Sequence, residues 1–78
     1  MTGQEMITCW VLVQLLTQDE ANTVTILSPN ADFNGQPDYA IIANGSWTNY
    51  EDRRFERDTI MECLDAANRE RVLYEKAN

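Results

Sequence analysis

The feature that most constrains the fold of this chain is a helix-start signal at Thr59. Thr59 and Glu62 have the spacing of a capping box, in which the Thr hydroxyl accepts from the Glu62 amide and the Glu side chain reaches back. Asp58 adds negative charge where the helix dipole favours it. The apolar residues that follow at helical spacing are Ile60, Cys63, Leu64, Ala67 and Tyr74. The pattern predicts a helix from residue 59 to about residue 76 with one apolar face.

Four stretches before this helix have the β-branched or alternating composition of strands. They are residues 5–16, 22–27, 38–43 and 46–50. Asn44-Gly45 separates the last two and predicts a type I′ hairpin turn, because both central residues of that turn need positive φ. Residues 28–37 have loop composition, with two prolines. The charged corner at residues 51–57 has room for a short strand through Arg54 and Phe55.

We therefore expect an α+β fold in a single domain, residues 1–78. The predicted order is β-β-β-β-α, a small antiparallel sheet of three to four strands with one C-terminal helix packed on one face. The first strand is apolar on its odd-numbered face and carries Trp10 and Leu12 on the other. A strand this apolar is central or covered from outside the chain. A homodimer through the first strand is therefore one expectation.

The charge is distributed unevenly along the chain. Thirteen acids and six bases give a formal net charge of −7, and residues 1–52 contain no Lys or Arg. The acids of that part are Glu5, Asp19, Glu20, Asp32, Asp38, Glu51 and Asp52. Nucleic-acid binding needs a basic footprint, so we expect no direct nucleic-acid or membrane contact and instead a protein partner with a basic surface. The alternative is that the acidity serves only solubility.

The residue types needed for most catalytic chemistry are missing. The chain has no histidine, which excludes Ser–His and Cys–His nucleophile systems and the usual zinc ligand sets. It also lacks a Gly-rich phosphate loop and calcium-loop spacing. We expect no catalytic residues, no metal and no cofactor, and so not an enzyme. Cys9 and Cys63 fall on predicted core faces and are expected to be buried thiols, with a bridge between them as the alternative.

The N-terminal sequence contains neither a signal-peptide pattern nor an apolar run long enough for a bilayer. We therefore expect a soluble protein of a reducing compartment, the cytoplasm.

An aromatic and acidic segment is the candidate binding site. Trp and Tyr are frequent interface anchors, and acids beside them select a basic partner. The predicted partner-binding residues are Trp47, Asn49, Tyr50, Glu51 and Asp52, with Asp19 and Glu20 as a second acidic site. The alternative is that the aromatic side chains, Phe55 above all, close the core under the helix. The three arginines at 53, 54 and 57 are expected to pair with neighbouring acids.

Over its whole length, in size, acidity and lack of catalytic motifs, the chain resembles small phage-encoded anti-CRISPR proteins. That resemblance implies a protein, in some cases a DNA mimic, that blocks target DNA binding by a CRISPR-Cas effector complex in the host cytoplasm. Residues 55–67, FERDTIMECLDAA, resemble the strand-to-helix junction of HicB-type antitoxins. The second resemblance implies a module that neutralises a small basic toxin. A self-associating structural phage protein is the remaining expectation.

Overall fold

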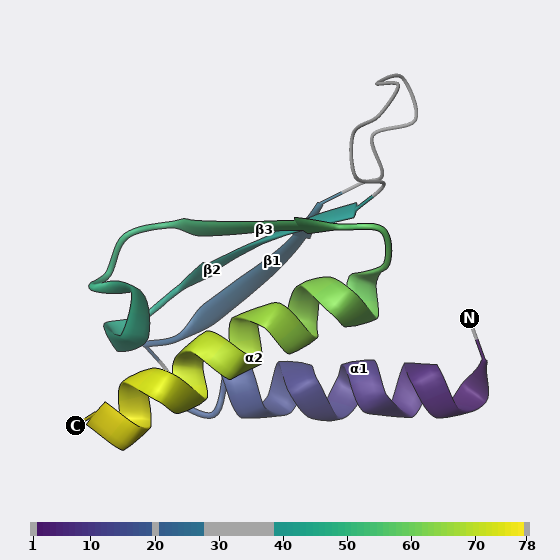
Figure 1. Cartoon of the computed structure of the whole chain (residues 1–78), viewed down its shortest axis with the longest axis horizontal. Coiled ribbons are helices and arrows are strands. Elements are labelled where there is room, and N and C mark those ends of the chain that lie inside the picture. Colours follow the sequence, from purple (N-terminus) through teal and green to yellow (C-terminus); the bar gives the residue numbers. More distant parts are fainter. Residues whose placement is uncertain (1, 20, 28–38, 78) are drawn as a thin grey trace.

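The computed structural model of the chain describes residues 2–19, 21–27 and 39–77. Its elements follow the order α1 (Gly3–Leu16), β1 (Thr23–Leu27), β2 (Tyr39–Asn44), a short 3-10 helix η1 (Ser46–Thr48), β3 (Arg53–Arg57) and α2 (Ile60–Ala77). The three strands form one layer, and both helices run along one face of it (Figure 1). The α+β class is confirmed, but the order is α-β-β-β-α.

The first element is a helix, so the predicted first strand is wrong. Thr2 caps α1: its hydroxyl accepts from the Glu5 amide at 3.2 Å and lies 3.2 Å from the Glu5 carboxylate. Along the helix the side chains of Cys9, Leu12, Val13 and Leu16 pack into the core. A run that is mostly apolar satisfies strand alternation and helical periodicity alike, and here its length favours the helix. In the described parts of the chain neither helix is long and apolar enough to cross a membrane.

The sheet is antiparallel, with strand order β1-β2-β3. Ile41 in the central strand is paired with Ile26 on one side and Phe55 on the other. The strands expected at residues 22–27, at 38–43 and through Arg54 and Phe55 are confirmed as β1, β2 and β3. The fourth strand expected at residues 46–50 is wrong, because that segment forms η1 and a turn. The predicted loop at residues 28–37 lies outside the described residues.

The C-terminal helix is confirmed, and its start has the expected cap. The Glu62 amide donates to the Thr59 hydroxyl at 3.1 Å, and that hydroxyl donates to the Glu62 carboxylate at 3.0 Å. The apolar stripe of α2 packs on the central strand and on β3. Arg71 interrupts the stripe and is only 8% exposed. Its guanidinium donates to Asn68 Oδ1 and, at 2.6 Å, to Glu75 Oε1, so its charge is satisfied within the helix.

The core lies between the sheet and the two helices. Its buried members are Leu12, Leu16, Ile41, Ala43, Phe55, Cys63, Leu64 and Ala67. Both cysteines are free thiols; Cys63 is fully buried, and Cys9 is half-buried on α1. Burial raises the pKa of both thiols above the ordinary value, and the nearby Glu5 carboxylate adds to the effect at Cys9. Of the eight buried core residues in the described part of the chain, five come from the two helices and three from the sheet.

Candidate functional site

The predicted patch lies in the connection between β2 and β3, residues 45–52, which we call the β2–β3 connection. Gly45 is its hydrogen-bonding centre. The Gly45 carbonyl accepts from the Thr48 amide at 3.0 Å and from the Tyr50 amide at 2.8 Å, and the Gly45 amide donates to the Thr48 hydroxyl at 3.0 Å. These bonds fold the chain into η1 and fix the backbone up to Tyr50.

Gly45 does not form the predicted type I′ turn. Its φ is 167°, which is extended backbone. A Cβ at this position would lie 2.0 Å from Asn22 Oδ1, so glycine is needed here for a close approach by the segment before β1. The Asn22 carboxamide oxygen also accepts from the Ser46 amide at 3.4 Å. The turn before β1 and the β2–β3 connection thus meet at one end of the sheet.

Asn49 and Tyr50 are the two described non-glycine residues with positive φ, at 62° and 60°. The Glu51 amide closes the turn by donating to the Thr48 carbonyl at 3.2 Å. Two successive left-handed residues inside such a bond are typical of a type I′ turn. Asparagine tolerates this conformation, but for a bulky residue it is an outlier that costs about 1–2 kcal/mol. The connection therefore holds Tyr50 in an unfavourable backbone conformation.

Side-chain packing does not account for the backbone conformation of Tyr50, because this residue is 66% exposed. The carboxylates that follow it, Glu51 and Asp52, are also exposed. Asp52 Oδ1 accepts from the Asn44 carboxamide at 2.9 Å, which fixes its position without neutralising it. An exposed aromatic ring and two carboxylates therefore stand side by side in sequence on a hydrogen-bonded turn.

The arginines that follow do not neutralise these acids. In the described residues, the ion pairs join Arg53 to Glu70, Arg54 to Glu56, Arg69 to Asp65 and Arg71 to Glu75. Arg57 donates instead to the Glu56 carbonyl. Of the expected ion pairs, Arg54 with Glu56 is confirmed, whereas the pairing of Glu51 and Asp52 with the neighbouring arginines is wrong. Both carboxylates keep their charge available to an external cation.

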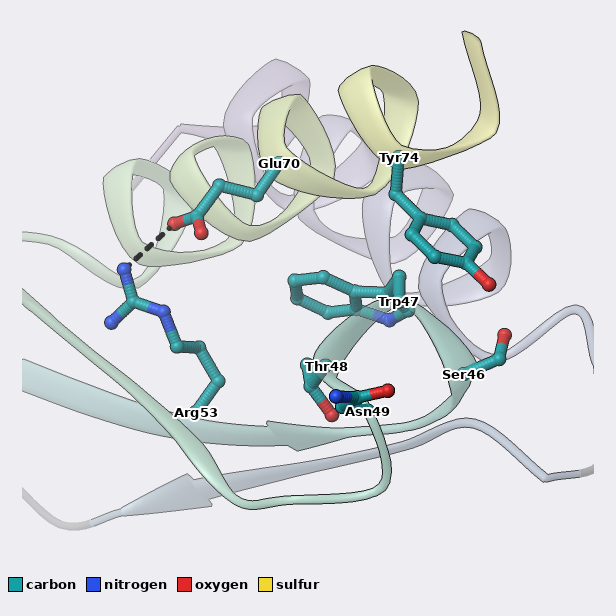
Figure 2. A pocket seen from close by; sticks show the side chains of 7 residues that line it. All are labelled: Ser46, Trp47, Thr48, Asn49, Arg53, Glu70 and Tyr74. Atoms are coloured by element: carbon teal, nitrogen blue, oxygen red, sulfur yellow. Dashed lines mark hydrogen bonds and ion pairs between the residues drawn. The ribbon is translucent and has the colours of Figure 1, made fainter. Parts of the chain in front are cut away.

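Behind the connection lies an open hollow of about 410 Å³ between η1 and the C-terminal half of α2. It is lined by Ser46, Trp47, Thr48, Asn49, Arg53, Glu70 and Tyr74. Figure 2 shows the Trp47 indole in the middle, with the Arg53–Glu70 ion pair on one side and the Tyr74 ring on the other. Arg53 Nη2 lies 3.1 Å from Glu70 Oε2, and its guanidinium carbon lies 4.8 Å from the centre of the Phe55 ring.

The aromatic residues of the predicted cluster have separate roles. Phe55 is 2% exposed and belongs to the core, as the structural alternative predicted. The half-buried Trp47 ring packs beside it, with ring centres 6.2 Å apart. Tyr50 alone of the three projects into solvent. Trp47 thus joins the connection to the core, and Tyr50 is left as its exposed aromatic group.

The second acidic site is only partly described. Asp19 is exposed, and it stabilises the turn before β1 by two hydrogen bonds. Its carboxylate accepts from the Ala21 amide at 3.0 Å, and its carbonyl accepts from the Asn22 amide at 2.9 Å. Glu20 lies outside the described residues. Because Asn22 touches Gly45 and Ser46, the turn that contains Asp19 is next to the β2–β3 connection. Asp19 is therefore placed at the same end of the molecule as the main patch.

Several residues of the hollow were not predicted. Glu70 and Tyr74 stand four residues apart on α2, so they share a face, and that spacing was the one signal available in the sequence. Their approach to η1 is a tertiary contact. In the described residues no group of three or more His, Cys, Asp or Glu side chains is placed to hold a metal ion. The arrangement offers an aromatic surface, hydroxyl groups and exposed carboxylates, which are groups that bind cationic side chains.

Comparisons of the chain with models of protein families, with curated proteins and with solved structures found no match in any of the three.

Proposed function

We propose that this chain is a non-enzymatic binding protein that docks its β2–β3 connection on a basic, nucleic-acid-handling surface of another protein. The observation that carries this proposal is Tyr50, which is 66% exposed, left-handed in backbone and followed by two carboxylates without a basic partner in the described residues. Strained residues that packing does not require are concentrated at binding and catalytic sites.

The conformation of Tyr50 favours binding because it is set before the partner arrives. A rigid aromatic side chain contributes a large contact area with little loss of conformational entropy. The hydrogen bonds around Gly45 fix the backbone of the turn in the unbound protein. The free-energy cost of the strained backbone at Tyr50 thus arises during folding and not during binding, and the partner encounters an aromatic ring that is already oriented.

Electrostatics supports a basic partner. The chain carries a net charge of −7, and its first 52 residues contain no Lys or Arg. Such a field accelerates encounter with a positively charged surface and repels nucleic acid. The Glu51 and Asp52 carboxylates would take the place of nucleic-acid phosphates on that surface. A CRISPR-Cas effector complex has a surface of this kind, and the inhibited step would be the binding of target DNA.

The test is the affinity of the purified chain for CRISPR effector complexes, measured by biolayer interferometry at about 0.05 and 0.5 M salt. At the higher ionic strength the screening length falls below about 5 Å, so the binding should weaken strongly. The variant Glu51→Lys with Asp52→Lys should bind at least about tenfold more weakly than the unaltered chain. Tyr50→Gly should also reduce affinity.

A matched control separates the patch from the overall charge. Asp58→Lys with Asp65→Lys also adds four charges, bringing the net charge from −7 to −3, at positions outside the connection. Equal weakening by the two double variants would refute docking through the connection. Affinity that does not respond to salt, or no binding to any effector complex, would refute the proposed target. Binding to a small basic toxin in place of an effector would refute the defence-complex target in favour of an antitoxin function.

A further inference from the structure

The outer face of α1 is apolar and exposed. Its side chains are exposed by 60% at Met6, 59% at Ile7, 65% at Trp10, 43% at Val11 and 36% at Leu15. The single charged residue of α1, Glu5, is held at the N-terminal cap by Thr2. The opposite side of the helix already packs into the core. A helix with an apolar inner face and five exposed apolar side chains on its outer face is normally covered on both sides, so this outer face needs a cover.

The face has a projection at one end and a hollow at the other. Trp10 stands near the middle of Gly3–Leu16. Ile7 projects from the N-terminal half. Beside Trp10, in the C-terminal half, an open hollow of about 430 Å³ is lined by Trp10, Val11, Gln14, Leu15, Thr17 and Gln18. An antiparallel copy of the same helix, turned about a two-fold axis between Trp10 and Val11, would bring each Ile7 to the other copy's Gln14, inside that hollow.

We propose that the outer face of α1 binds a second copy of this chain, with the two α1 helices antiparallel and the two-fold axis between Trp10 and Val11. Such an interface is isologous, so the contact between the projection of one copy and the hollow of the other occurs twice. The contact is independent of the β2–β3 connection and goes beyond the proposed function.

Charge favours a second copy over other occupants. Two chains of net charge −7 repel each other, and they can associate where the contact itself carries no acid. The outer face of α1 meets that condition, since its exposed residues are apolar or, at Gln4 and Gln14, polar without charge. A basic amphipathic partner would find no carboxylate on this face to pair with. An anionic membrane surface would be repelled by the net charge of the chain.

The exposed apolar area of this face determines the expected affinity of the dimer. The five apolar side chains expose on the order of 500 Å² on each copy, at the upper end of what monomers normally leave uncovered. The dimer would bury roughly 1,000 Å² in total, the lower bound for a specific interface. We therefore expect a reversible dimer with a dissociation constant in the micromolar range.

The first experiment is sedimentation equilibrium from about 1 to 500 μM, a range that brackets micromolar dissociation. The unaltered chain should change from monomer to dimer across this range. The Trp10→Glu variant should remain monomeric, because one carboxylate from each copy would lie beside the two-fold axis and the two would repel each other. The matched control is Leu73→Glu, which alters another exposed apolar residue, 66% exposed on α2, and should dimerise like the unaltered chain. A chain that is monomeric throughout, or equal effects of the two substitutions, would overturn the proposal.

Cross-linking tests the geometry without relying on the fold of the Trp10 variant. In a Cys9→Ala background, Ile7→Cys and Gln14→Cys are made as separate proteins, with Cys63 left buried. A mixture of the two should form a disulfide-linked heterodimer on mild oxidation, and each protein alone should not. Self-linking of Ile7→Cys would show a parallel arrangement and overturn the antiparallel two-fold axis between Trp10 and Val11. No heterodimer above the level given by Leu73→Cys mixed with Gln14→Cys would overturn the interface.

Discussion

The left-handed backbone of Tyr50 leads to a prediction about stability. We expect Tyr50→Gly to be more stable than Tyr50→Ala by about 1 kcal/mol, because glycine enters this region freely and alanine does not. Both variants remove the same ring, so the comparison cancels the loss of its contacts. The ring is 66% exposed, and its remaining burial is worth at most about 1–2 kcal/mol. Tyr50→Gly should therefore lie within about 1 kcal/mol of the unaltered chain.

The assay is urea unfolding at 25 °C, followed by far-ultraviolet circular dichroism. For a chain of this size a difference of 1 kcal/mol also shifts the thermal midpoint by roughly 4–8 °C. Two controls test the sign of the stability difference between glycine and alanine. At Arg69, exposed in the middle of α2, the order should reverse, and alanine should be more stable than glycine by about 1 kcal/mol. Asn49→Gly should change stability by only a few tenths of a kcal/mol, since asparagine tolerates its φ of 62°.

Equal stabilities of Tyr50→Gly and Tyr50→Ala would refute the reasoning, because the backbone at this residue would then not be left-handed in solution. If the expected order is found, the functional consequence can be measured on the same proteins. Tyr50→Gly would be a properly folded chain that has lost its aromatic anchor. Its reduced affinity for a basic partner could not be attributed to unfolding.

Two further predictions concern the core and the turn. Gly45→Ala should lower the free energy of unfolding by about 1–3 kcal/mol, because the new Cβ would lie 2.0 Å from Asn22 Oδ1; Asn22→Gly should recover part of this loss, and equal losses in both backgrounds would contradict the contact. Burial raises the pKa of the Cys63 thiol, so the unfolded chain releases this proton first as the pH rises past about 9. The free energy of unfolding should then fall between pH 8 and 10, and urea titrations of Cys63→Ala should show a shallower fall.

The elements that were predictable from sequence are those whose signals agree with one another. At α2, the cap at Thr59 and the apolar stripe point to the same helix, and the structure confirms it. At α1, residues 5–16 favoured a strand because the odd-numbered residues from Ile7 to Leu15 are all apolar. Two features of the sequence indicate the helix that the structure contains. Thr2 and Glu5 have capping-box spacing, and the run is too long for an ordinary strand. The exposed face of α1 is what made its pattern ambiguous.

The turn was misassigned for a different reason. Asn44-Gly45 has the composition of a type I′ turn, but Gly45 is required by Asn22, a residue distant in sequence. The left-handed pair lies at Asn49 and Tyr50, and tyrosine has no local preference that would reveal it. The candidate patch could be proposed from the sequence because its members are contiguous. The hollow behind it was not, since it depends on how α2 packs against η1.

The pairing of α1 with α2 also has a consequence for biosynthesis. The ribosome releases α1 well before its packing partner α2, because all three strands lie between the two helices in the sequence. Contacts between distant segments form slowly, and apolar surface left uncovered in the meantime attracts other chains. A polypeptide that stops before α2 would expose both sides of α1. Only a copy that includes α2 can bury the inner side, so synthesis interrupted before α2 would leave apolar surface that favours aggregation.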